Sequence, residues 1–445
     1  MKRLFFLVLA LCLAVPPPTG AQARSGGKAP TLVGYKLISV KAAGTSRYTD
    51  KEILTASGLR IGQNAADADF KEAARRLGDS GLFNNVVYSF SYSDAGVKLE
   101  FQLTDVEQSK LVPASFENFV WFTDTELLQA VQSVVPLFKQ LLPADGRLPD
   151  QVNEALQALL AQKHLPGRID FLRQGQRDGG DLTGIVYRVE GVTMRIRNLE
   201  FPGASPEQSA FLTNAVHKLV GVQYSRLALA AVAKFDLLPL YRQRGYLKAA
   251  FGPSDAHAVT PSASDRESHP QDDIEVDAIL PVTPGKQYSV SGVTWKGNAA
   301  VTTDEASHLF HLATGQPADA EHLILDAETL TRLYHSRGYM TAQVKPDTQL
   351  DEENTTVHYD INVTESDLYK MGELEILGVD TPSKDRLREA WTLREGQPYN
   401  ADYTQNFLGD AAHFVPRGLD FSVKVSEELD AQNKTVDVTL HFKVQ

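Results

Sequence analysis

The sequence has almost no cysteine. Cys12 is the only one in 445 residues. It lies in an N-terminal stretch typical of a secretory signal, in which Lys2 and Arg3 precede a short apolar run and the small-residue pattern Ala21-Gln22-Ala23. Cleavage after Ala23 would leave a mature chain without thiols, which excludes disulfides and cysteine catalysis. No later apolar run approaches the length of a transmembrane helix, so we expect an exported, soluble protein.

Positive charge is also scarce. Lys and Arg number 44 against 56 Asp and Glu, which gives a formal net charge of −12. Nucleic acids and anionic lipid head groups are bound through cationic contacts. The charge balance therefore predicts no nucleic-acid partner.

Motifs of catalysis and cofactor binding are missing as well. The chain contains neither a Gly-x-Ser-x-Gly nucleophile elbow nor a His-Glu-x-x-His zinc motif. Glu305, His308 and His311 would share one face of a helix, but no closely spaced fourth ligand accompanies them, so surface histidines are the better interpretation. We therefore predict no catalytic residue, no cofactor and no metal site. An enzyme is the least favoured of three hypotheses for function.

The sequence does have one strand pattern that occurs five times. Apolar and polar residues alternate in each copy, as in a strand with one buried and one wet face. The intervals between the ends of successive copies are 86, 91, 83 and 81 residues, which predicts an array of small domains. The apolar positions are Val97, Leu99, Phe101, Leu103; Ile185, Tyr187, Val189; Ile274, Val276, Ala278, Leu280; Val357, Tyr359, Ile361, Val363; and Val436, Val438, Leu440, Phe442, Val444.

Each copy ends a longer unit with further shared features. Helix starts with capping-box spacing occur at Thr49-x-x-Glu52, Thr123-x-x-Glu126, Ser205-Pro206-x-Gln208 and Thr302-x-x-Glu305. A turn of the Gly-Gln type recurs at Gly62, Gly221, Gly315 and Gly396, and the second helix ends in a matching Leu-Tyr-x-x-Arg-Gly-Tyr element at 240–246 and 333–339. Within that element, Gly245 and Gly338 are placed as left-handed helix caps, and Gly81 and Gly418 hold the matching positions.

The order strand, helix, helix, strand, strand predicts an α+β fold. The last two strands should form an antiparallel hairpin, which the first strand joins through a helical crossover. The expected unit is a three-stranded mixed sheet backed on one face by two helices.

Five such units account for nearly all of the chain after the signal. The predicted boundaries are 1–23 for the signal peptide and 32–109, 110–193, 194–287, 288–367 and 368–445 for the units. The second unit is divergent, because residues 163–167 replace the helix end and residues 136–149 are inserted. The third carries an insertion at 253–273, rich in Pro, Ser, Asp and His, which we expect to be a flexible hairpin loop.

This unit resembles the POTRA domain, the polypeptide-transport-associated module of outer-membrane assembly and translocation proteins. The resemblance implies a periplasmic protein at the inner face of the outer membrane, peripherally associated with it. It further implies that the partners are unfolded outer-membrane protein segments, a separate β-barrel protein, or both. The chain stops at Gln445, one residue past the fifth alternating strand, and we expect a complete array without a barrel rather than a clipped one.

The inferred sheet places the second strand at an edge, where unpaired backbone groups can bind an extended chain. The candidate binding residues lie on the second strands of the first and fourth units: Val86, Val87, Tyr88, Ser89, Phe90, Tyr92, Thr341, Gln343 and Val344. The period-two spacing of Tyr88, Phe90 and Tyr92 could equally mark a buried face. Two hypotheses are therefore carried forward. One is a non-enzymatic periplasmic scaffold that binds clients by β-augmentation, and the other is an envelope tether that joins partners without handling clients.

Overall fold

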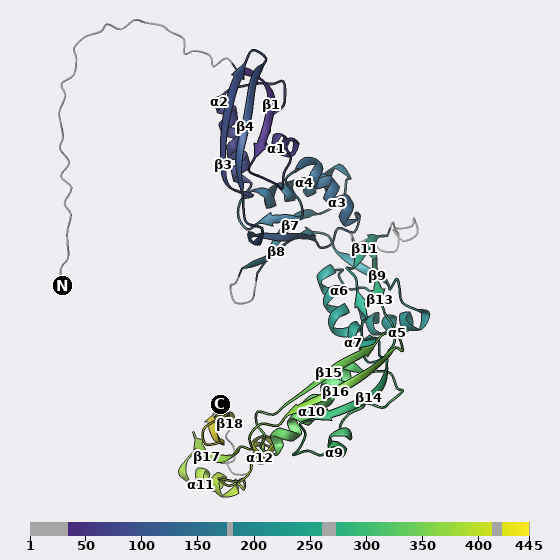
Figure 1. The fold of residues 1–445 in the computed structure, drawn as a ribbon, viewed down its shortest axis with the longest axis vertical. Coiled ribbons are helices and arrows are strands. Elements are labelled where there is room, and N and C mark those ends of the chain that lie inside the picture. Colours follow the sequence, from purple (N-terminus) through teal and green to yellow (C-terminus); the bar gives the residue numbers. More distant parts are fainter. Residues whose placement is uncertain (1–33, 176–180, 260–272, 412–420, 445) are drawn as a thin grey trace, which may run out of the picture. The chain divides into compact units, whose positions relative to one another are not determined.

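The computed structural model describes residues 34–175, 181–259, 273–411 and 421–444 (Figure 1). The chain divides into two compact units, one running to Pro113 and including Val131–Val152, the other formed by Ala114–Ala130 with Asn153–Gln445. The expected signal peptide and Gly418 lie outside the described residues. Among the helices of the described part, none is both long and apolar enough to cross a membrane.

The first two sheets each have four strands. One has the order β2-β1-β4-β3 and the other the order β6-β5-β8-β7. In each, the first strand runs parallel to the last one, and the last two strands form an antiparallel hairpin. Their bounds are β1 (Tyr35–Ala43), β2 (Asn64–Ala65), β3 (Phe83–Ser93), β4 (Gly96–Asp105), β5 (Leu111–Phe116), β6 (Leu141–Pro143), β7 (Arg168–Gly175) and β8 (Leu182–Glu190).

Three further sheets repeat the same topology. Their orders are β11-β12-β9, β14-β16-β15 and β17-β19-β18, and a short pair joins β10 to β13. The predicted mixed sheet, with its third strand in the centre and its second strand at an edge, is therefore confirmed. The bounds are β9 (Met194–Glu200), β10 (Ala250–Phe251), β11 (Asp255–Ala258), β12 (Ile274–Ile279), β13 (Val282–Thr283), β14 (Ser289–Lys296), β15 (Gln343–Asp351), β16 (Thr356–Thr364), β17 (Lys370–Leu377), β18 (Phe421–Asp430) and β19 (Thr435–Val444).

Helices connect the first strand of each sheet to the hairpin. Thr49 with Glu52, and Ser205 with Gln208, form complete capping boxes. At Thr302 the box is only half made, because the Glu305 side chain pairs with Arg337 instead. The bounds are α1 (Asp50–Ser57), α2 (Asp67–Asp79), α3 (Asp124–Val134), α4 (Leu148–Gln162), α5 (Pro206–Val216), α6 (Arg226–Val232), a π-helical turn (Ala233–Leu237), α7 (Leu238–Arg242), α9 (Thr303–Ser307), α10 (Ala320–Ser336), α11 (Thr381–Ala390) and α12 (Tyr403–Ala411), with 3₁₀ turns at Gln108–Lys110 and His217–Leu219.

The alternating strands supply the cores, as predicted. Val97, Leu99, Phe101 and Leu103 of β4 are at most 1% exposed. The matching residues of β8 and β16 are buried as well, and so are Val436, Val438, Leu440 and Phe442 of β19, while Ile274 at the start of β12 is only half-buried. Most residues between them are exposed or half-buried, and Val186 and Asp360 are the buried exceptions, so each central strand turns its main apolar face to its helices.

The recurring Gly-Gln turn has a structural explanation, since it exchanges two backbone hydrogen bonds with the first strand. The amide of Gly62 donates to the Leu37 carbonyl at 2.7 Å, and the amide of Leu37 donates to the Gln63 carbonyl at 2.8 Å. Equivalent pairs tie the later turns to Ile196, Val290 and Met371. The sequence repeat thus marks a repeated backbone clasp.

Three local predictions were wrong. Asp255–Ala258, inside the expected loop at 253–273, form β11 and pair with β12, while residues 260–272 lie outside the described part. In the same unit the second strand, expected at the sheet edge directly after the helices, is reduced to the short β10, and β11 takes the edge of that sheet. The helix expected to carry Glu305, His308 and His311 on one face ends at Ser307, so the three side chains do not share a helix face.

Candidate binding edges

The second strand is the edge strand in the sheets that contain β3, β7, β15 and β18, and β11 replaces it in the third sheet. β3 is the longest of these edges, with 11 residues. Within the described residues its backbone pairs with β4 alone. An edge in this state leaves a row of donors and acceptors with which an incoming strand can pair.

Three edge strands show which of their backbone nitrogens face away from the neighbouring strand. Pro346 in β15 has no N–H and lies opposite Ile361, so its nitrogen faces the free edge rather than the ladder. In β11 the Ala258 amide leaves the ladder and donates to the Val120 carbonyl at 2.9 Å. In β7 the Ile169 amide donates to Gln157 Oε1 at 2.8 Å. In all three strands the residue whose nitrogen faces outward lies opposite a core residue of the central strand.

Aligning the first sheet with the β14-β16-β15 sheet shows which amides of β3 face outward. In the parallel pairings Leu37 lies opposite Val97 and Val290 lies opposite Val357, and both registers slip at the next step. Phe101 therefore corresponds to Ile361, and Tyr88, which lies opposite Phe101, corresponds to Pro346. We infer that the Tyr88 amide faces the free edge and that the Ser89 amide faces β4.

The described edges are therefore not equivalent. The edges of β7 and β11 each have an outward amide already bonded, and the edge of β15 is interrupted by Pro346. β3 carries no proline and no such bond, and β18 also lacks proline over its 10 residues. Of the two open strands, β3 is the one with an aromatic surface.

The predicted binding residues of β3 fall on two faces. Tyr88, Phe90 and Tyr92 form an aromatic stripe that leans on Phe70 of α2, with ring centres of Phe70 and Phe90 5.3 Å apart. Val87 and Ser89 point to the opposite, exposed face, where Val87 is 51% exposed. The stripe is thus the helix-facing side of the strand, and Val86 on that side is half-buried.

The aromatic stripe nevertheless reaches the surface at one end. Tyr92 is 54% exposed and its ring centre lies 4.5 Å from that of Tyr35. At the other end the Tyr88 hydroxyl donates to Asp67 Oδ1 at 3.0 Å. Burial raises the pKa of Tyr88 and the bond to Asp67 raises it further, so this phenol stays neutral and fixes the strand to the start of α2.

The second predicted group, on β15, is less suited to binding. Thr341 lies in the turn before the strand, where its hydroxyl donates to Ser366 Oγ at 2.8 Å. Gln343 is exposed and Val344 packs against the core of its sheet. Pro346 follows two residues later and removes an outward amide in the middle of the edge.

Sequence reasoning missed the contacts that join one segment to the next. The carbonyl of Gly245 accepts a hydrogen bond from the Tyr288 amide, and that of Gly338 accepts one from the Tyr369 amide, both at 2.8 Å. The glycine that ends the second helix is therefore also the docking point for the following first strand. The signal was present in the sequence, because a tyrosine opens both following units.

A second contact reinforces the joint at Tyr288. Glu352, in the turn between β15 and β16, accepts a 2.6 Å hydrogen bond from the Tyr288 hydroxyl and pairs with Lys248. These bonds, from Lys248 first and then from Tyr288, hold the pKa of Glu352 below its ordinary value. The hairpin turn of one segment is thereby fastened to residues of the segment before it.

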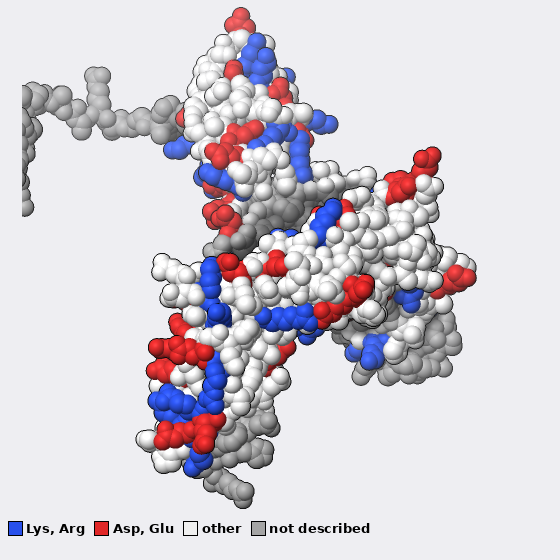
Figure 2. Space-filling view, turned by 60° about the horizontal axis from the view of Figure 1, so that its bottom comes forward, with Lys and Arg blue, Asp and Glu red and all other residues white. Residues whose placement is uncertain are grey.

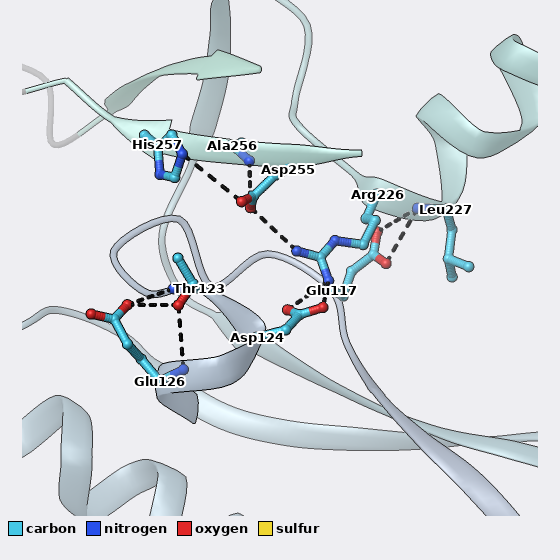
Figure 3. Close-up of polar contacts among 9 residues, drawn as sticks. All are labelled: Glu117, Thr123, Asp124, Glu126, Arg226, Leu227, Asp255, Ala256 and His257. Carbon is cyan, nitrogen blue, oxygen red and sulfur yellow. Dashed lines mark hydrogen bonds and ion pairs between the residues drawn. The ribbon is translucent and has the colours of Figure 1, made fainter. Parts of the chain in front are cut away.

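Arg226 at the start of α6 is the centre of another polar cluster (Figure 3). Its guanidinium donates to both carboxylate oxygens of Asp124 at 2.9 Å and approaches Asp255 of β11 at 3.5 Å. Burial lowers the pKa of Arg226, but the bonds and charge of Asp124 outweigh it, and the pKa is raised. One cation therefore holds α3, α6 and β11 together.

Glu117 completes this cluster from the loop after β5 (Figure 3). Its carboxylate accepts hydrogen bonds from the Ser225 hydroxyl at 2.5 Å and from the Leu227 amide at 3.1 Å. It thus satisfies donors at the N-terminus of α6, where negative charge is stabilising. The cluster is a structural clamp, and it leaves β11 occupied rather than free.

On the face shown in Figure 2, surface charge does not single out another kind of site. Basic and acidic side chains are interspersed over the face shown in Figure 2. Within the described ranges no group of three or more His, Cys, Asp or Glu side chains is placed to hold a metal ion. Backbone pairing at an open edge is the chemistry that the described residues offer most plainly.

Comparison with known proteins agrees with this geometry. Residues 288–366 match the family model described as "POTRA: Surface antigen variable number repeat". Residues 288–366 are thus a POTRA domain. The matched segment contains β14, β15, β16 and α10, and the strand order that defines it recurs in the other sheets.

The relative and the solved structures described next share little sequence with this chain. It is 23% identical over 177 residues to the outer membrane protein assembly factor BamA of Buchnera aphidicola, covering 39% of this chain and 28% of that one. The chain thus spans about a quarter of that relative's length. It is also similar to the crystal structure of Haemophilus influenzae BamA POTRA3-5, with TM-score 0.41, 18% identity, and coverage of 57% and 96% of the two chains. The N-terminal domain of Omp85 from Thermosynechococcus elongatus gives TM-score 0.24, 16% identity, and coverage of 56% and 97%.

Proposed function

We propose that this protein is a non-enzymatic periplasmic scaffold that acts in outer-membrane protein assembly or translocation. It would bind extended segments of unfolded outer-membrane proteins, or of a separate β-barrel protein, by adding them as a strand to β3. The family match and the name of the BamA relative support the general role. The open 11-residue edge of β3 carries the specific proposal.

Backbone pairing suits such a role because it depends little on the client's sequence. Main-chain hydrogen bonds supply affinity, and side-chain contacts on alternate positions supply selectivity. The exposed Val87 and Tyr92 offer apolar contacts on opposite faces of the edge. A membrane-barrel strand of roughly ten residues also alternates apolar and polar side chains, so its length and its pattern match β3.

The test uses a synthetic barrel-strand peptide and single prolines in β3. Tyr88→Pro copies into β3 the proline that β15 carries at the corresponding position, and it should remove an outward amide while sparing the ladder. We expect it to weaken peptide binding by about tenfold, the scale of one lost backbone hydrogen bond plus an interrupted edge. Tyr88→Ala is the matched control, because it removes the side chain but keeps the amide.

Ser89→Pro checks the register on which this test depends. Its amide should face β4, so the substitution should unfold the hairpin, as seen by circular dichroism. If Tyr88→Pro is folded and binds the peptide as tightly as Tyr88→Ala does, β3 is not the binding edge and the proposal for this strand fails.

A second candidate function is an envelope tether, and the occupied edges favour it. β7, β11 and β15 each have an outward position that is bonded or lacks an amide, and polar contacts at Arg226, Gly338 and Glu352 join segments. A parent protein that binds none of a set of barrel-strand peptides would support the tether over the client receptor.

A further inference from the structure

Two histidines beside the β14-β16-β15 sheet lie close together with tilted rings, although the sequence gives them no metal motif. His322 is on the first turn of α10, and His311 is in the loop before that helix. Their ring centres are 5.3 Å apart. Both side chains are open to solvent, 71% exposed for His311 and 47% for His322.

A carboxylate holds each ring by the same nitrogen. His311 Nδ1 lies 2.8 Å from Asp326 Oδ1, and His322 Nδ1 lies 2.5 Å from Asp319 Oδ2. Among the described residues neither Nε2 has a hydrogen-bond partner. A carboxylate on Nδ1 keeps the proton there and leaves the Nε2 lone pair free, the arrangement that supports histidine ligands of zinc.

The two carboxylates are themselves fixed. Asp326 is 4% exposed, and its second oxygen accepts a 2.7 Å hydrogen bond from the His311 amide. Asp319 caps α10, accepting from the amides of Glu321 at 3.1 Å and His322 at 2.9 Å. Both imidazoles are therefore positioned from one helix before any ligand arrives.

The ring separation fits a shared metal ion. A tetrahedral zinc ion bound by two Nε2 atoms at about 2.1 Å would hold the two ring centres about 5 Å apart, close to the 5.3 Å observed. Imidazole suits Zn²⁺, Cu²⁺ and Ni²⁺. We propose that His311 and His322 form a two-histidine site for a divalent transition metal, with Asp326 and Asp319 as positioning residues.

Such a site would leave two coordination positions open. Water would fill them in the free protein, and a carboxylate or imidazole from a bound chain could replace it. A closed structural zinc site has four protein ligands. The described residues provide no third ligand beside this pair, so we expect the bound ion to exchange.

The test is Zn²⁺ titration of the untagged mature chain at neutral pH by calorimetry. We expect one ion per chain, and a visible absorption band of low-coordinate cobalt when Co²⁺ replaces Zn²⁺. His311→Ala and His322→Ala should each weaken binding by about tenfold or more, and Asp326→Asn should weaken it by about 10-fold to 100-fold. His308→Ala is the matched control, because His308 is an exposed histidine of the same region whose Nδ1 contacts only the Asp304 carbonyl.

Nitrogen NMR of the imidazoles provides a readout that does not depend on affinity. Zinc should shift the Nε2 signals of the two histidines and spare their Nδ1 signals. The proposal is overturned if the parent binds no stoichiometric ion, if both alanine variants bind as the parent does, or if His308→Ala loses as much affinity as they do. Melting curves of the metal-free variants separate loss of the ligand from loss of the fold.

Discussion

β3 and β15 hold the same place in the same kind of sheet, yet they present opposite surfaces. β3 has 11 residues without proline and an aromatic stripe that ends in the half-exposed Tyr92. β15 carries Pro346 in its middle, and the turn that follows it bonds through Glu352 to the preceding segment. One edge is open and available for the pairing that we propose, whereas the other is interrupted by a proline and lies next to a joint.

This difference shows that repeating a fold does not repeat its binding surface. The central strands and their buried faces are alike in both sheets, because the core requires them. The edges are free to differ, since a single residue such as Pro346 decides whether an outward amide exists. The specialisation of each sheet therefore lies in a few edge and turn residues.

The largest expected effect concerns the joint at the end of α10. Gly338 has φ +93°, and a Cβ there would lie 2.7 Å from the Tyr369 carbonyl oxygen. Gly315 is also left-handed, with φ +82°, but a Cβ there would meet nothing within 4 Å. Gly315→Val should therefore cost only backbone strain of about 1–3 kcal/mol, and Gly338→Val should cost about 1–3 kcal/mol more from the clash.

Chemical denaturation of the two variants measures this difference. It also tests the idea that the glycine is a docking point, because Gly338→Val should expose the Tyr369 amide to hydrogen exchange and Gly315→Val should not. Equal destabilisation by both substitutions would show that Gly338 acts as a helix cap alone.

The strand pattern could be predicted because period-two burial is encoded locally. Val97, Leu99, Phe101 and Leu103 alternate with polar residues whatever they pack against, and all four are buried. The helix starts were also local, since a capping box joins residues three apart, as Thr49 and Glu52 do.

Which edges are open was harder to predict from the sequence, because this depends on contacts between distant residues. The Ala258 amide donates a hydrogen bond to the carbonyl of Val120, 138 positions earlier, and no local sequence pattern indicates that bond. The aromatic spacing of Tyr88, Phe90 and Tyr92 left two faces possible, and only the position of Phe70 on α2 decides between them. The histidine pair was missed because Asp319 and Asp326 act on rings from two different elements.

A smaller effect should follow from opening the closed edge. Pro346→Val restores an outward amide to β15, and a β-branched residue suits this half-buried position. If the proline is what closes the edge, the variant should gain affinity for a barrel-strand peptide by up to about tenfold, the value of one backbone hydrogen bond. The measurement is peptide binding in the Tyr88→Pro background, so that β3 contributes little. Affinity that stays at the background level would mean that the Glu352 joint, rather than Pro346, keeps β15 closed.

The smallest expected effect is a pH dependence of stability that belongs to the Glu352 joint and not to the β3 edge. The bonds from Lys248 and Tyr288 hold the folded-state pKa of Glu352 below its ordinary 4.5. A carboxylate of this kind stabilises the fold above its unfolded pKa, and the contribution disappears as the pH falls through the folded value. The melting temperature of the parent should therefore fall more between neutral pH and pH about 4 than that of Glu352→Gln, in which the titrating group is absent.

Glu353→Gln is the matched control, because the Glu353 side chain has no ion pair among the described residues, and it should follow the parent. Peptide binding at β3 should not change with Glu352→Gln, and a parallel loss of binding would show that the open edge and the closed joint are coupled.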